Sequence, residues 1–313
     1  MARRKKGQKV DGWIILDKPY EMSSTQALGK VRWLLDAQKG GHGGTLDPLA
    51  TGVLPLAFGE ATKTIPYILN AKKTYQFDVT FGTATNTDDI EGEVVETSDH
   101  LPTAEDIQNI LPQFTGDIEQ IPPAYSALKI DGERAYAKAR KGEEVIMKPR
   151  PVTILELEFQ GIEGSVATFE AMVSKGTYIR SLGRDIAAAL GSCGHISRLR
   201  RTSIGEKGGK LTEKQAISLE DVEKKVASAG GKGHIPPHLL GAVDSLLDDI
   251  PAHEITPSEA QDLKLGKELT LPQVKSTGLL RAVNAEGQIL SLLDVTADGQ
   301  AKIVRNFNIN DIV

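Results

Sequence analysis

The feature that most constrains the fold of this chain is a glycine-rich stretch, residues 40–55, which reads Gly-Gly-His-Gly-Gly-Thr-Leu-Asp-Pro-Leu-Ala-Thr-Gly-Val-Leu-Pro. Glycine suits positions where the backbone takes a positive φ or approaches another group closely. The Asp47-Pro48 step favours a turn and biases Asp47 away from helical conformation. We expect a carboxylate presented on an irregular loop that apolar neighbours hold against a core. A plain surface turn, in which Asp47 bonds its own backbone, fits the pattern equally well.

The rest of the sequence offers no nucleotide motif and no metal-ligand set. The glycine-rich stretch lacks the spacings Gly-x-x-x-x-Gly-Lys-Ser/Thr and Gly-x-Gly-x-x-Gly. His234 and His238 have the spacing of metal ligands on a helix, but two prolines between them prevent that helix. Cys193 is the single cysteine, and no Gly-x-Ser-x-Gly elbow is present. We therefore expect no metal and no cofactor, and chemistry carried out by side chains alone.

Length and composition predict a soluble, cytoplasmic protein. The chain has 313 residues, enough for about two domains, and its hydrophobic fraction of 40% supports a packed core. One cysteine excludes an internal disulfide framework and suits a reducing compartment. A basic N-terminal tail is not followed by a signal-peptide-like apolar segment, and no run of 18 apolar residues predicts a membrane span.

The net charge of −5 argues against nucleic-acid binding, but the basic residues are clustered. One cluster is Arg198, Arg200 and Arg201, and the other is Lys138, Arg140, Lys141, Lys148 and Arg150. Acidic residues gather elsewhere, around residues 88–93 and 244–249. Each basic cluster fits an RNA-binding face, and each also fits an ordinary solvated surface.

Local patterns place the Asp47 loop directly after a helix. A capping box at Ser23 and Gln26 begins that helix, and Gly40 is expected to end it in a left-handed conformation. Further expected helices span 104–113, with Thr103 as cap, and 133–140, 179–191 and a segment from Ser218; expected strands span 12–19, 74–82, 152–160, 166–174 and 196–204. From about residue 250 short β segments separated by Glu-Gly and Asp-Gly turns predict a small strand-rich domain.

Three further side chains could assist a carboxylate. Arg180 lies in the first turn of the 179–191 helix, where the helix dipole disfavours a cation, and this hints at an anionic partner. Tyr75 and Tyr178 offer flat faces on which an unstacked RNA base could stack. Each residue alone could equally pack in the core or reach solvent, so these residues by themselves indicate no more than a base-handling enzyme.

Residues 40–52 closely resemble the motif of the TruB family of tRNA pseudouridine synthases. The resemblance continues in Leu-Asp-Lys-Pro at 16–19, Lys-Thr-Tyr at 73–75, Pro-Pro-Ala-Tyr-Ser-Ala at 122–127, Gly-Thr-Tyr-Ile-Arg at 176–180 and Leu-Arg-Arg at 199–201. It implies an α+β fold with a mixed, largely antiparallel sheet, flanking helices and an open cleft. It also implies a basic tail (1–11), a catalytic domain (12–249) with a thumb-like RNA-gripping insertion (122–152), and a PUA-like domain (250–313).

The resemblance further implies an activity and the residues that serve it. Family members convert the T-arm uridine of tRNA, position 55, to pseudouridine without a cofactor, which makes tRNA the expected partner of a monomeric enzyme. Asp47 matches the catalytic aspartate, and it could attack the ribose, add to the base or remove a ribose proton. His42, Tyr75, Tyr178, Leu199 and Arg180 match substrate-site residues, with Arg180 as partner of the aspartate. Expected RNA contacts are Lys18, Tyr125, Arg140, Arg150, Arg200 and Arg201.

Two other classes of function remain open at this stage. A non-catalytic tRNA-binding or folding chaperone would bind RNA through the same surfaces, although an intact Asp47 argues against it. A nucleoside hydrolase would usually need two positioned carboxylates, and no second one is linked by motif to Asp47.

Overall fold

A mixed ten-stranded sheet forms the core of the computed structural model, which describes residues 7–126, 128–130, 133–135, 145–206, 209, 211–274 and 276–309. In spatial order its main strands are β14 (Ile217–Ser218), β1 (Gly12–Lys18), β3 (Ala50–Phe58), β12 (Gly194–Ile204), β4 (Lys73–Phe81), β11 (Val166–Val173), β10 (Arg150–Glu163) and β7 (Gly116–Gln120). Two short strands, β2 (Gly40–His42) and β13 (Leu211–Thr212), pair with β3 and β12. The pairs β1–β14 and β3–β12 are parallel, and the other pairs are antiparallel.

The strands follow the alternation that the sequence predicts. In β4 the side chains of Phe77, Val79 and Phe81 are buried, and Phe77 stacks on Phe169 of β11 with ring centroids 5.4 Å apart. The α+β class with a mixed, largely antiparallel sheet is therefore confirmed.

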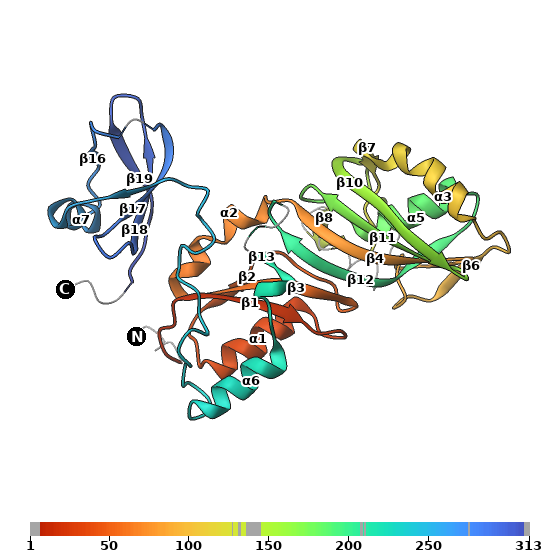
Figure 1. The fold of residues 1–313 in the computed structure, drawn as a ribbon, viewed down its shortest axis with the longest axis horizontal. Coiled ribbons are helices and arrows are strands. Elements are labelled where there is room, and N and C mark those ends of the chain that lie inside the picture. The colour runs from red at the N-terminus through yellow and green to blue at the C-terminus, as the bar shows by residue number, and fades with distance from the viewer. Residues whose placement is uncertain are drawn as a thin grey trace.

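The helices cover the sheet at two places. Helices α1 (Ser24–Leu34) and α6 (Leu219–Ser228) lie side by side near the β1 and β3 end, and α5 (Ile179–Ala189) packs against β12 and β4 (Figure 1). The remaining elements of this part are η1 (Gly59–Lys63), α2 (Ile65–Leu69), α3 (Ala104–Ile110), η2 (Leu111–Phe114), η3 (Glu213–Gln215), the ribbon β5 (Thr83–Thr85) with β6 (Val94–Thr97), and the ribbon β8 (Lys129–Ile130) with β9 (Glu133–Arg134). No helix in the described ranges is both long enough and apolar enough to cross a membrane.

Two predicted elements need correction. The capping box at Ser23 is present, but α1 ends at Leu34, and the residue with a positive φ is Asp36 rather than Gly40, which begins β2. The helix stops early because Gln8, far away in sequence, donates two hydrogen bonds at this end: its backbone N–H donates to Asp36 O and its side-chain amide donates to Leu35 O. The expected helix over 133–140 is wrong at its start, since residues 133–134 form β9, and residues 136–140 lie outside the described residues.

A second, five-stranded sheet follows the first. Its order is β15 (Ala252–Glu254), β17 (Gly278–Val283), β18 (Ile289–Val295), β19 (Gln300–Asn306) and β16 (Leu269–Thr270), and α7 (Pro257–Lys264) accompanies it (Figure 1). Leu292 and Phe307 share a hydrophobic cluster with Trp13 of β1, and Arg281 pairs with Asp244 at 2.9 Å. The C-terminal sheet therefore packs on the outer end of the first sheet.

Candidate functional site

Asp47 lies in the loop between β2 and β3, as the glycine and proline pattern predicts. The loop is held on the helix side by Ser24, whose hydroxyl accepts from Leu46 N–H at 2.7 Å and donates to Leu46 O at 2.9 Å. The Asp47 side chain keeps 39% of its surface exposed. The local structure thus fixes the backbone of the loop and leaves the carboxylate accessible.

Lys18 and Arg201, which the sequence analysis expected to contact RNA, have buried side chains that hold the same loop. Lys18 is fully buried and its Nζ donates to three carbonyl oxygens, including Pro48 O at 3.2 Å. Burial lowers the pKa of Lys18 to about 8, although the attraction of Asp47 acts in the opposite direction. Arg201 is 1% exposed and donates to Gly44 O and Val53 O. Neither side chain lies where a phosphate could reach it.

Arg180 is the partner of Asp47. It lies in the first turn of α5, is almost fully buried, and places Nη2 3.0 Å from Asp47 Oδ2. Its other nitrogen, Nη1, lies 3.3 Å from Asp89 Oδ2 and donates to Thr87 O at 2.9 Å. The unfavourable place of this cation in its helix is therefore compensated by two carboxylates, since charge-assisted bonds are stronger than the helix-end effect.

Asp89 was not singled out from the sequence, where it is one of several acidic residues in the stretch 88–93. It is 2% exposed, accepts from the Thr87 hydroxyl at 2.6 Å and from Glu91 N–H at 3.0 Å, and anchors Arg180. The only signal in the sequence was the acidic stretch 88–93 itself. A buried carboxylate next to a surface stretch of carboxylates cannot be distinguished from its neighbours by composition.

Two connected cavities meet at Asp47. The inner one, about 270 Å³, is lined by Tyr75, Tyr178 and Leu199, and the outer one, about 1010 Å³, is lined by His42 and Tyr125. The residues that line both cavities are Thr45, Leu46, Asp47, Ser126 and Arg180, and we call them the neck. Five of the predicted site residues, Tyr75, Tyr178, Leu199, Arg180 and Asp47, thus border the inner cavity, and His42 borders only the outer one.

Three titratable side chains beside the neck, those of His42, Tyr178 and Glu91, have pKa values shifted in the direction that favours their neutral forms. Burial and the nearby Arg201 lower the pKa of His42, so its imidazole is neutral at pH 7, and its buried Nδ1 has no hydrogen-bond partner among the described residues. Burial raises the pKa of Tyr178, which keeps the phenol protonated. Burial, followed by the charges of Asp89 and Asp47, raises the pKa of Glu91 in the outer cavity.

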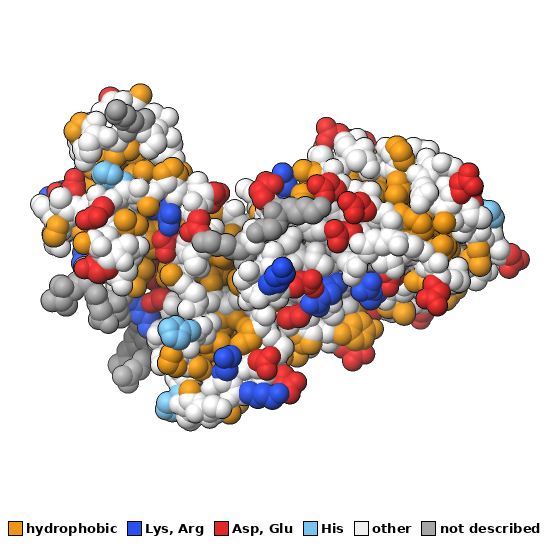
Figure 2. Space-filling view, in the orientation of Figure 1, with side chains coloured by type: hydrophobic (Ala, Val, Ile, Leu, Met, Phe, Trp, Pro, Cys, Tyr) orange, Lys and Arg blue, Asp and Glu red, His pale blue; other side chains and the backbone are white. Residues whose placement is uncertain are grey.

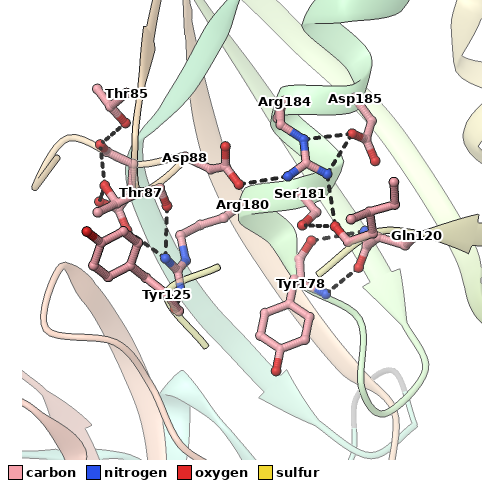
Figure 3. Close-up of polar contacts among 12 residues, drawn as sticks. Thr85, Thr87, Asp88, Gln120, Tyr125, Tyr178, Arg180, Ser181, Arg184 and Asp185 are labelled. Carbon is pink, nitrogen blue, oxygen red and sulfur yellow. Dashed lines mark hydrogen bonds and ion pairs between the residues drawn. The ribbon is translucent and has the colours of Figure 1, made fainter. Parts of the chain in front are cut away.

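The start of α5 holds the segment 120–126 in place (Figure 3). Gln120 exchanges two hydrogen bonds with the backbone of Tyr178, accepting from its N–H at 2.8 Å and donating to its carbonyl at 3.1 Å. Ser181 and Arg184 both donate to Ile121 O, and Arg180 Nη2 donates to Tyr125 O at 2.8 Å. Gln120 was not singled out from the sequence, although it lies only two residues before the Pro-Pro-Ala-Tyr-Ser-Ala motif.

The remaining predicted RNA contacts differ in accessibility. Arg200 is half-buried and forms ion pairs with Asp17 at 2.9 Å and with Glu213. Arg150, at the start of β10, is exposed, whereas Arg140 lies outside the described residues. Within the described ranges no group of three or more His, Cys, Asp or Glu side chains is arranged to hold a metal ion.

Comparison with known proteins assigns the family. A model of the TruB family pseudouridylate synthase N-terminal domain matches residues 32–179, and one of the tRNA pseudouridylate synthase B C-terminal domain matches residues 180–248. The chain belongs to the TruB family. Relatives named tRNA pseudouridine synthase B include one from Caulobacter sp. strain K31, 47% identical over 92% of this chain and 90% of that protein, and one from Bradyrhizobium diazoefficiens, 45% identical over 99% and 89%. As a TruB family member the chain is a pseudouridine synthase, an isomerase.

Solved structures agree with this assignment at the level of the fold. A chain of a Cbf5–Nop10–Gar1 complex superposes with a TM-score of 0.69 at 25% identity, covering 95% of this chain and 84% of that one. A chain from a structure of an H/ACA RNP bound to a substrate RNA containing 2′-deoxyuridine gives a TM-score of 0.71 at 22% identity, covering 99% and 92%. The TruB family fold thus accounts for nearly the whole chain.

Proposed function

We propose that this protein converts uridine 55 in the T arm of tRNA to pseudouridine, with Asp47 as the catalytic residue. The observation that carries the proposal is the position of Asp47 at the neck between a pocket with aromatic walls and a larger open cavity. The curated relatives are named for tRNA, and the sequence motifs around Asp47 resemble those of enzymes that act on the T arm.

The two cavities fit an extruded nucleotide. A base inside a folded RNA loop must be flipped out before its glycosidic bond can be reached, at a cost of a few kcal/mol. Stacking on an aromatic ring returns about 1–3 kcal/mol per base. In this proposal the uracil enters the inner cavity against Tyr75 and Leu199, the ribose stays at the neck beside Asp47, and the rest of the RNA lies in the outer cavity. His42, neutral and at the wall of the outer cavity, occupies the side from which the base departs.

The reaction needs no net oxidation or reduction. The bond between ribose C1′ and N1 of uracil breaks, the base rotates, a bond forms between C1′ and C5, C5 loses its proton and N1 gains one. Arg180 orients the Asp47 carboxylate toward the neck through an ion pair, and a second ion pair with buried Asp89 holds the Arg180 guanidinium in place. The inner cavity retains the detached uracil while it turns, which is a positioning effect.

Asp47→Asn tests the proposal directly. The amide keeps the size of the side chain and loses its nucleophilicity and basicity, so pseudouridine formation in unmodified tRNA should be abolished while tRNA binding is nearly unchanged. Asp294→Asn, which changes an exposed aspartate of the C-terminal sheet, is the matched control and should react at the wild-type rate.

Pseudouridine mapping in the wild-type reaction decides the position, and a tRNA with cytidine at position 55 should remain unmodified. Turnover of Asp47→Asn within tenfold of wild type would remove Asp47 from the catalytic role. Tight tRNA binding by wild type without any pseudouridine would indicate a tRNA-binding chaperone instead.

A further inference from the structure

Ser126 has a buried hydroxyl that no protein group satisfies. The residue is 3% exposed, and its Oγ has no hydrogen-bond partner among the described residues. The large majority of buried side-chain polar atoms in proteins are hydrogen-bonded, so an unpaired one calls for a functional reason. The other unpaired buried side-chain atoms in the described part of the chain are His42 Nδ1, also at this site, and Asn306 Oδ1 in the C-terminal sheet.

The position of Ser126 identifies what its hydroxyl faces. Ser126 belongs to the neck, because it lines both the inner and the outer cavity, as Asp47 does. This step rests on the proposed function: with the uracil in the inner cavity and the phosphates outside, the group that passes through the neck is the ribose of the target nucleotide. A hydroxyl at the neck therefore lies beside the sugar rather than beside the base.

The backbone next to Ser126 is fixed relative to Asp47. Arg180 Nη2 donates to Tyr125 O at 2.8 Å (Figure 3). The same nitrogen lies 3.0 Å from Asp47 Oδ2. Further back, Ser181 and Arg184 both hold the carbonyl of Ile121. One guanidinium nitrogen thus sets the distance between the catalytic carboxylate and the segment that carries Ser126.

The chemistry of the neighbouring groups leaves the Ser126 hydroxyl available to a ligand. Burial raises the pKa of the neighbouring Tyr178 phenol, and a hydrogen-bonding contact from the Ser126 hydroxyl acts to lower it, but the two hydroxyls do not reach the geometry of a normal hydrogen bond. A serine hydroxyl can donate one hydrogen bond and accept two. The ribose 2′-hydroxyl has the same dual capacity and is the group by which a protein distinguishes RNA from DNA at a given site.

We infer that Ser126 is a substrate-binding residue whose hydroxyl binds the 2′-hydroxyl of the target nucleotide, and that this contact makes the enzyme prefer a ribonucleotide at that one position. The rest of the RNA is recognised elsewhere, so the preference is confined to a single sugar. Ser126 takes no part in bond making or breaking.

The test crosses two variants with two ligands. The ligands are T-arm stem-loops that differ at the target nucleotide alone, one carrying uridine and the other 2′-deoxyuridine. Equilibrium affinities are measured in the Asp47→Asn background, so that turnover does not alter the ligand, for Ser126 and for Ser126→Ala. From the energy of one neutral hydrogen bond, we expect the protein with Ser126 to bind the uridine ligand about fivefold more tightly than the deoxyuridine ligand. The protein with Ser126→Ala should bind the two ligands equally.

The ratio between the two ligands is independent of the fraction of folded protein, so a moderate loss of stability in Ser126→Ala does not disturb it. Ser126→Cys, which keeps the volume of the side chain and loses most of its hydrogen-bonding strength, should show the same loss of preference. An equal weakening of both ligands, or an unchanged preference, would overturn the inference by showing a structural role or no contact. Failure of the proposed function would look different, since wild type would then form no pseudouridine in tRNA.

Discussion

Arg180 is the residue on which most of the site converges. Its guanidinium joins Asp47, Asp89 and the carbonyls of Thr87 and Tyr125, so one buried cation links the Asp47 loop, the acidic segment and the segment 120–126. A planar guanidinium supplies several donors in fixed directions, whereas an ammonium supplies a compact point charge. The geometry therefore needs arginine rather than any cation.

Arg180→Lys should keep the positive charge and lose most of the hydrogen bonds that the guanidinium makes to two carboxylates and two carbonyls. The lysine cannot reach both carboxylates and both carbonyls, so we expect single-turnover pseudouridine formation to fall by about a hundredfold, the scale of a misplaced catalytic group. Loss of buried hydrogen bonds should also lower the free energy of unfolding by about 2 kcal/mol. The control is Arg198→Lys in an exposed pair with Asp78, which should change neither quantity noticeably. A rate within threefold of wild type would show that only the charge of Arg180 matters.

The lowered pKa of Lys18 predicts how the free energy of unfolding should change with pH. Its pKa is about 8 in the folded protein and near its ordinary value of 10.5 in the unfolded chain. Between these values the unfolded chain binds more protons, so the contribution of Lys18 to stability rises with pH. We expect the free energy of unfolding of wild type, relative to Lys18→Met, to increase by about 2 kcal/mol between pH 7 and pH 10.

Urea unfolding of both proteins at several pH values measures this difference. Tyrosines and other lysines titrate in both proteins and cancel in the comparison. A difference that is flat with pH, or that falls, would mean that burial does not lower the pKa of Lys18 in the folded protein.

The sequence predicts which residues lie around Asp47 better than it predicts the hydrogen bonds and ion pairs that hold them in place. Asp47, Arg180, Tyr75 and Leu199 lie together as expected, because motif residues keep their types and order. The burial of Lys18 and Arg201 was not predicted, since a charged residue type does not reveal that its side chain turns inward to bond carbonyl oxygens.

Asp89 and Gln120 were missed for a related reason. Their roles depend on contacts between segments that are far apart along the chain, such as the bond between Gln120 and Tyr178. The same physics moved the end of α1, where contacts from Gln8 override the local glycine signal. Local patterns thus predict the helices and strands. Hydrogen bonds between distant segments decide where these elements end and how the residues around Asp47 are held.

At the level of elements, the parallel pairing of β3 with β12 depends on Gly52. Gly52 has φ of +98° and pairs with Arg201, and a Cβ there would lie 2.2 Å from Arg201 O. Such a contact is too short for any side chain, so β3 would have to separate from β12 just beyond the Asp47 loop. Glycine at this position therefore serves both the backbone conformation and the close approach of the two strands.

Gly52→Ala should lower the free energy of unfolding by more than about 3 kcal/mol, from positive-φ strain and a backbone clash together. Gly116 in β7 has nearly the same φ, +96°, and open space around its Cβ position, so Gly116→Ala measures the strain alone, about 1–2 kcal/mol. Denaturant midpoints of the two variants give the comparison. Equal losses would contradict the role of close strand approach.

At the scale of the whole molecule, the face seen in Figure 2 has locally balanced charge among its described residues rather than a separate basic patch. Figure 2 shows Lys and Arg side chains alternating with Asp and Glu side chains over the middle of one face, near β12. The pairs Arg198–Asp78 and Arg200–Asp17 belong to this strand. An acidic protein can still bind RNA, but only cations that are not already paired should contribute to the release of counterions.

This distinction gives a prediction for Arg150 and Arg200, the two expected RNA-contact arginines that the structure describes as at least partly exposed. Arg150 is exposed and has no ion pair among the described residues, and it lies close enough to Tyr178 to lower the pKa of that phenol, so it lies near the proposed binding site. Arg150→Ala should weaken binding to any T-arm stem-loop and reduce the slope of log K against log salt by about one.

Arg200→Ala, the matched control, removes a cation already neutralised by Asp17 and Glu213 and should leave the slope unchanged. Affinities measured between 50 and 200 mM salt, a range of about fourfold in which such slopes are resolved, separate the two outcomes. If the slope changes for Arg200→Ala and not for Arg150→Ala, the RNA lies over β12 rather than beside Tyr178, and the proposed path of the T arm is wrong.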